Sequence, residues 1–122
     1  MTFEILDFDL IETVEGALEV MAGSAFGKGI ELACEIATGV NQRLRGDPGR
    51  LRQVLTNLIG NAIKFTSQGE VLLRVTQKNE TGTQVELRFD VHDSGIGILG
   101  EAQTRLFQPF TCFGSSKKRQ QS

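Results

Sequence analysis

A polar stripe runs along one predicted helix, formed by Asn57, Asn61 and Lys64. Because each residue of a helix adds a rotation of about 100°, these side chains fall within an arc of about 60°. An amide oxygen can ligate Mg²⁺, which also binds water and phosphate oxygens, and a lysine one turn later can meet phosphates as a point charge. The stripe therefore predicts the lining of a polar pocket. The alternative is that the asparagines are exposed and only decorate the helix.

A glycine-bearing loop, Asp93-Ser94-Gly95-Ile96-Gly97-Ile98, follows an apolar strand. The Asp93 carboxylate can accept a hydrogen bond from an amino group such as the exocyclic amine of adenine, and the glycines let the backbone approach a flat ring. The loop lacks the Gly-Lys-Ser/Thr of a Walker loop and the third glycine of a dinucleotide fingerprint. The loop alone is therefore compatible with contact to a flat ligand that carries an amino group, and an ordinary turn is the alternative.

The first part of the chain is predicted to fold as a helix followed by a strand. Asp9 and Glu12 have the spacing of a capping box, and apolar residues then recur at helical spacing until Gly27 and Gly29. Residues 30–36 alternate between apolar and other side chains, which is typical of a strand.

The helix that carries the polar stripe begins with Asp47 as N-cap and Pro48 in the first turn. The order of elements predicts an α+β sandwich with helices on one face of a mixed sheet. In chain order we expect a short strand at 43–45, this helix to about 66–69, strands at 71–75 and 85–91 joined by a turn at 79–82, and a short helix at 101–107.

The composition excludes several classes of function. The 122 residues carry a net charge of −2, which argues against a nucleic-acid coat, and the one basic cluster, 117–119, is interpreted as a solvated tail. Cys34 and Cys112 cannot complete a zinc set with the lone His92, which we interpret as structural, and Cys34 is predicted to be a small core residue. No signal peptide or bilayer-spanning stretch is visible, which predicts a cytoplasmic segment without membrane contact.

Three segments together resemble the ATP-binding domain of bacterial hybrid sensor histidine kinases, in the superfamily shared with gyrase B subunits, MutL-type repair proteins and the large heat-shock chaperone. Residues 47–66 resemble its N box, 93–98 its first glycine box and 106–110 its F box. The resemblance covers nearly the whole chain. It implies one domain over 1–122 with the two-layer Bergerat fold, in which 111–122 are the remnant of an ATP lid.

The resemblance also implies ATP and Mg²⁺ as cofactors. Partners would be a helical dimerisation domain that carries the phosphorylated histidine, and a response regulator downstream; an inner-membrane anchor on the parent protein is left open. Asn61 would ligate Mg²⁺, and Asp93 would bind the adenine amine. The remaining implied nucleotide-site residues are Asn57, Lys64, Phe65, Gly95, Gly97, Ile98 and Phe110.

Two departures from the family pattern bear on activity. Hydrolysing members carry a glutamate one turn before the magnesium asparagine, where this chain has Asn57, and an amide cannot act as a general base. We therefore expect a kinase-type site and not an ATP-driven clamp. The family's second glycine box is missing after Phe110, so the fold would be incomplete at its C-terminal side, with an open sheet edge. The alternative is a non-catalytic fragment that binds ATP weakly or not at all.

Overall fold

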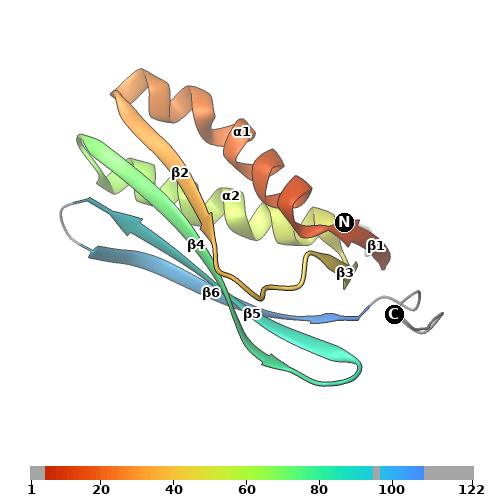
Figure 1. Ribbon diagram of the computed structural model, residues 1–122. Coiled ribbons are helices and arrows are strands. Elements are labelled where there is room, and N and C mark those ends of the chain that lie inside the picture. The colour runs from red at the N-terminus through yellow and green to blue at the C-terminus, as the bar shows by residue number, and fades with distance from the viewer. Residues whose placement is uncertain (1–4, 95–96, 109–122) are drawn as a thin grey trace.

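A computed structural model describes residues 5–94 and 97–108. The helices lie together on one face of a twisted mixed sheet, which gives the two-layer arrangement that the sequence predicts (Figure 1). Across the described residues, the strands follow the spatial order β1-β3-β6-β5-β4-β2. The elements are β1 (Leu6–Asp9), α1 (Leu10–Lys28), β2 (Ile30–Ile36), β3 (Arg43–Gly46), α2 (Pro48–Phe65), β4 (Gly69–Glu80), β5 (Gln84–Asp93) and β6 (Gly97–Phe107).

Both helices begin where the cap residues predict. The Asp9 carboxylate accepts hydrogen bonds from the backbone N–H groups of Ile11 at 2.9 Å and Glu12 at 3.2 Å, and Asp47 accepts one from Arg50 at 3.1 Å. These bonds satisfy donors that have no partner within the helix. At its other end α1 closes on Gly29, whose φ of 72° is left-handed, so the helix extends past Gly27.

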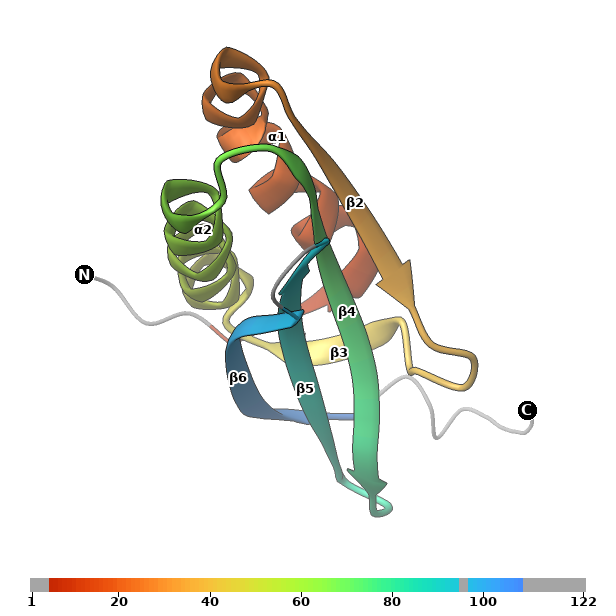
Figure 2. The same cartoon turned by 90° about the vertical axis from the view of Figure 1, so that its left-hand side faces the viewer.

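The core fills the space between the helices and the sheet. Figure 2 shows α1 and α2 on the same side of β4 and β5, and within residues 5–94 and 97–108 the opposite face of the sheet bears no helix. Alternate residues of β4 and β5 point into this core because side chains alternate between the two faces of a strand. The fully buried members with large side chains include Leu10, Leu44, Leu55, Ile59, Leu73, Leu87 and Phe89.

The prediction of a short helix at 101–107 is wrong, because this segment lies within β6. It pairs antiparallel with β5 from Gln84↔Phe107 to Asp93↔Gly97. A helix of two turns has little stability of its own, whereas strand pairing gives partners to the backbone groups along β5. This segment therefore pairs along β5, the described sheet stays open with β1 and β2 at its edges, and Leu106 is buried as part of the core.

Three smaller expectations also differ from the structure. Cys34 is exposed on the edge strand β2 and is not a core residue, because no further strand covers that side of it within the described chain. The β4–β5 turn comes later than predicted, since β4 continues through Glu80, and Thr81 closes the turn by accepting at its hydroxyl from the N–H of Gln84 at 3.0 Å. The four-residue strand β1 was not anticipated.

Candidate nucleotide site

The polar stripe of α2 is exposed on the side of the helix away from the core. Leu55, Ile59 and Ala62 are buried, whereas Asn57, Asn61 and Lys64 all face solvent. No residue in the described parts of the chain forms a hydrogen bond with the Asn57 or Asn61 carboxamide. The stripe therefore presents amide oxygens that a ligand could reach. Exposure alone also fits the alternative that the asparagines are surface residues without a ligand.

The end of the stripe has an aromatic neighbour. Lys64 Nζ lies 5.8 Å from the centroid of the Phe65 ring, and that ring is 68% exposed. A large apolar ring left this exposed at a helix end can pack against a flat ligand.

Asp93 is joined to α2 by a hydrogen bond that sequence reasoning missed. Thr66, the C-cap of α2, donates from its hydroxyl to Asp93 Oδ2 at 3.0 Å. Thr66 is only 2% exposed and Asp93 is half-buried, so the contact is partly shielded from water. Asp93 is therefore held beside the helix that carries Asn61, five residues before Thr66, rather than on a distant surface. The only sequence feature that pointed to this hydrogen bond was the presence of a hydroxyl residue, Thr66, directly after the helix.

The residue after Asp93 fixes the loop to the start of β4. Ser94 donates its N–H to the Glu70 carbonyl at 3.1 Å, and its hydroxyl accepts from the Glu70 N–H at 3.3 Å. Gly69 has a left-handed φ of 103°, and a Cβ there would lie 2.3 Å from Ser94 Oγ. A glycine is therefore required at this position for the loop to close as it does.

The beginning of β6 forms the side of the site opposite Asp93. Gly97 is the register partner of Asp93 and has a φ of 106°, and Ile98 is 55% exposed. Further along β6, a Cβ added to Gly100 would lie 3.0 Å from Leu58 Cδ1, so the strand passes close to the middle of α2. The described members of the predicted site thus lie on α2 and at the β5–β6 junction, which the Thr66–Asp93 bond joins. Gly95 and Phe110 lie outside the described residues.

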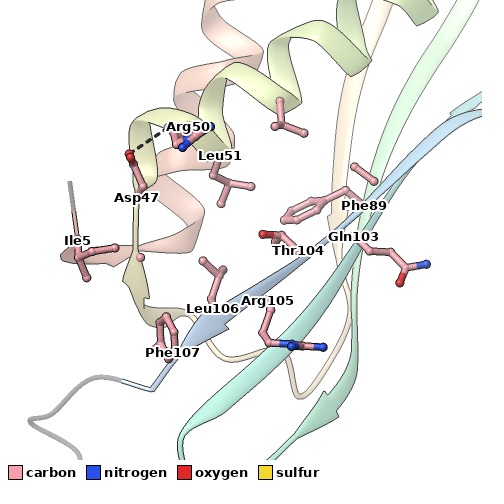
Figure 3. A pocket seen from close by; sticks show the side chains of 13 residues that line it. Ile5, Asp47, Arg50, Leu51, Phe89, Gln103, Thr104, Arg105, Leu106 and Phe107 are labelled. Carbon is pink, nitrogen blue, oxygen red and sulfur yellow. Dashed lines mark hydrogen bonds between the residues drawn. The ribbon is translucent and has the colours of Figure 1, made fainter. Parts of the chain in front are cut away.

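A cavity of about 290 Å³ lies elsewhere, between the first half of α2 and the later part of β6 (Figure 3). Asp47 and Arg50 stand at one side of it, and Phe89 and Leu106 face it from the sheet. It includes neither Asn61 nor Asp93 and is mainly apolar. The polar stripe and this cavity therefore lie at opposite ends of α2. We place the candidate site at the polar side chains and not at the cavity.

The oxygen donors near Asn61 fit a Mg²⁺ ion that binds together with the phosphates of a nucleotide. Within residues 5–94 and 97–108 there is no cluster of three or more His, Cys, Asp or Glu that could hold a metal. Mg²⁺ is usually bound through one or two protein oxygens together with waters and phosphate oxygens. One exposed carboxamide beside a lysine fits that mode. In the described chain, neither helix is long and apolar enough to cross a membrane.

Comparison with known proteins identifies the family of this chain. The histidine kinase-, DNA gyrase B- and HSP90-like ATPase family model matches residues 46–122, which include α2, Asp93 and β6. The chain is 39% identical over 110 residues to the signal transduction histidine-protein kinase BarA of Escherichia coli (strain K12), an alignment that covers 90% of this chain and 12% of BarA.

A second relative and a solved structure give the same result. The sensory/regulatory protein RpfC of Xanthomonas campestris pv. campestris is 44% identical over 105 residues, covering 85% of this chain and 14% of RpfC. The crystal structure of full-length ShkA in complex with AMPPNP superimposes with a TM-score of 0.59 at 32% identity, over 73% of this chain and 19% of ShkA. The chain thus spans only about an eighth of the length of BarA and about a seventh of the length of RpfC. It belongs to the histidine kinase-, DNA gyrase B- and HSP90-like ATPase family.

Proposed function

We propose that this chain is the ATP-binding domain of a two-component sensor histidine kinase and works in the cytoplasm. It would supply Mg-ATP for phosphorylation of a histidine on a separate helical dimerisation domain, with a response regulator as the next acceptor. The observation that carries the proposal is the hydrogen bond from Thr66 to Asp93. It joins the carboxylate that we assign to adenine binding to α2, the helix that presents Asn61 and Lys64. The name of BarA supports the kinase class, the name of RpfC supports a sensory and regulatory role, and the AMPPNP complex of ShkA supports an adenine nucleotide.

The roles follow from chemistry and position. Asp93 would accept a hydrogen bond from the adenine amine, with Gly97 and Ile98 forming the wall beside the ring. Asn61 would ligate Mg²⁺ through its amide oxygen, and the metal would neutralise charge on the phosphates. The remaining side chains would complete the pocket: Asn57 beside the metal, Lys64 against phosphate, Phe65 near the nucleotide, and Gly95 and Phe110 by the family resemblance.

The sequence at Asn57 disfavours an ATP-hydrolysing clamp. A hydrolysing clamp needs a general base one helical turn before the magnesium ligand, and Asn57 cannot take a proton from water. The domain would instead act by positioning the γ-phosphate for a nucleophile on another domain.

A second candidate is a chain that binds nucleotide weakly and has no catalytic role. The pairing of β6 along the whole of β5 favours it, because Gly97 and Ile98 are then committed to a strand. The two candidates differ in affinity, so one measurement separates them.

Calorimetric titration of the chain with ATP, with and without Mg²⁺, tests the proposal. We expect magnesium-dependent binding that is lost in Asp93→Asn and weakened in Asn61→Ala. Gln53→Ala, an exposed amide on the same helix, is the matched control and should bind like wild type. Binding that is absent up to millimolar ATP would select the second candidate. A separate assay with the helical domain and labelled ATP should place phosphate on that domain, and label on His92 instead would contradict the assignment.

A further inference from the structure

The last turn of α2 is held by a cation from the other helix. Lys28, the final residue of α1, donates from Nζ to the carbonyl oxygens of Ile63 at 2.7 Å and Lys64 at 3.3 Å. The last carbonyls of a helix have no partner within the helix and form its negative end. A lysine ammonium placed there satisfies two of them and complements the dipole.

The position of the Lys28 ammonium is also fixed by the end of α1. The chain turns sharply after Lys28 at Gly29, whose N–H returns to the carbonyls of Ala25 and Phe26. Ala25 is buried in the core, so the end of α1 cannot move freely against α2. Lys28 itself is exposed, and its contribution is therefore a local contact with α2 and not burial of its own side chain.

The last turn of α2, which Lys28 holds, carries one side chain of the candidate site, Lys64. This turn ends at Thr66, whose N–H bonds to the same Ile63 carbonyl at 3.3 Å. Thr66 then donates to Asp93 at 3.0 Å. A continuous series of contacts thus runs from Lys28 through the end of α2 to Asp93.

We propose that Lys28 is a positioning residue for the nucleotide site, which it serves by keeping the last turn of α2 closed so that Thr66 and Lys64 stay in place. The inference rests on the proposed function. Removing the ammonium opens the last turn, and the Thr66–Asp93 bond then forms in only part of the population. A residue that merely stabilises the fold would change the melting temperature without this local effect.

The test compares Lys28→Met, which keeps the length of the stem, with Lys28→Arg, which keeps a donor cation. Lys78→Met, an exposed lysine on β4, is the matched control. Each full chain is titrated with Mg-ATP to millimolar concentration by NMR, and amide exchange at Thr66 is followed alongside exchange in β4 and β5.

We expect Lys28→Met to weaken ATP binding by roughly tenfold, equivalent to about 1.4 kcal/mol. Exchange at Thr66 should become faster while exchange in β4 and β5 is unchanged, and Lys28→Arg should restore both properties. Equal affinity and equal Thr66 exchange in wild type and Lys28→Met would overturn the inference and leave the proposed function intact. A wild-type chain that does not bind ATP would overturn the proposed function, and the inference with it.

Discussion

The hydroxyl of Thr66 donates to Asp93 Oδ2 across 3.0 Å, and so connects the end of a helix to the end of a strand 27 residues later. Thr66 is almost fully buried and Asp93 is half-buried, so this bond is partly shielded from water. It fixes the direction of one carboxylate oxygen of Asp93. The geometry of the candidate site therefore depends on a residue that has no ligand contact assigned to it.

Thr66→Val should lower both stability and nucleotide affinity. Valine has nearly the same shape but no hydroxyl, so Asp93 loses a shielded donor, at a cost of about 1–3 kcal/mol. Urea unfolding measures the free energy and ATP titration measures the affinity. Thr66→Ser keeps the hydroxyl and should retain the affinity. If Thr66→Val bound ATP as tightly as wild type, the bond would have no part in forming the site.

Gly69→Ala should destabilise the chain through two separable effects. The backbone at Gly69 has a φ of 103°, and an added Cβ would lie 2.3 Å from Ser94 Oγ. Left-handed backbone in a residue with a side chain costs about 1–3 kcal/mol, and the contact adds to it. Thermal unfolding should show partial recovery in the double variant with Ser94→Ala, which removes the contact but not the strain.

Gly82→Ala is the matched control for this prediction, because a Cβ at Gly82 meets nothing within 4 Å. It should unfold close to the wild-type temperature. Full recovery in the double variant would show that backbone strain at Gly69 contributes little.

Sequence patterns predicted those elements whose signals are local. Asp9 and Asp47 mark both helix starts because capping depends on residues three positions away. Alternation placed β4 and β5 because each has one face against the helices. The polar stripe on α2 followed from helix geometry alone, and its three side chains do share the exposed face.

The features that were missed depend on partners far away in the chain. The segment from Glu101 to Phe107 has a composition that suits a short helix, and it forms a strand because β5 offers an edge to pair with. Thr66 and Lys28 owe their importance to contacts with residues 27 to 36 positions away. No local pattern shows which helix end meets which strand end.

Asn61→Ala should reduce magnesium-dependent ATP binding without affecting the fold. Asn61 is exposed, and substitutions at such positions usually change stability by no more than about 0.5 kcal/mol. If its amide oxygen ligates the metal, affinity in the presence of Mg²⁺ should fall by roughly tenfold or more, equivalent to about 1.4 kcal/mol. Affinity without Mg²⁺ should stay the same. An equal loss under both conditions would assign Asn61 to the nucleotide and not to the metal.

Arg88→Met should loosen β6 from β5. Arg88 Nε donates to Asp90 at 2.7 Å, and its guanidinium also pairs with Glu101 of β6. Asp90 is 7% exposed, so the variant leaves a nearly buried carboxylate without its cation. We expect a lower melting temperature and faster amide exchange along β6. In Arg88→Met with Asp90→Asn, the loss should be smaller than the sum of the single effects.

Cys34 should react slowly with alkylating reagents at neutral pH although the residue is exposed. Partial shielding of its thiol from water raises the pKa of Cys34, and the carboxylates of Glu15 and Glu35 raise it further. Since the thiolate is the reactive form, the rate should reach its midpoint at a higher pH than for the unfolded chain. A raised folded-state pKa adds stability that is fully present below the unfolded pKa and is lost as pH rises through the folded one. Cys112→Ser provides the background in which only Cys34 reacts, and Glu35→Gln should shift the rate profile towards lower pH. A profile that matches the unfolded chain would show that neither the shielding nor the two carboxylates act on the thiol.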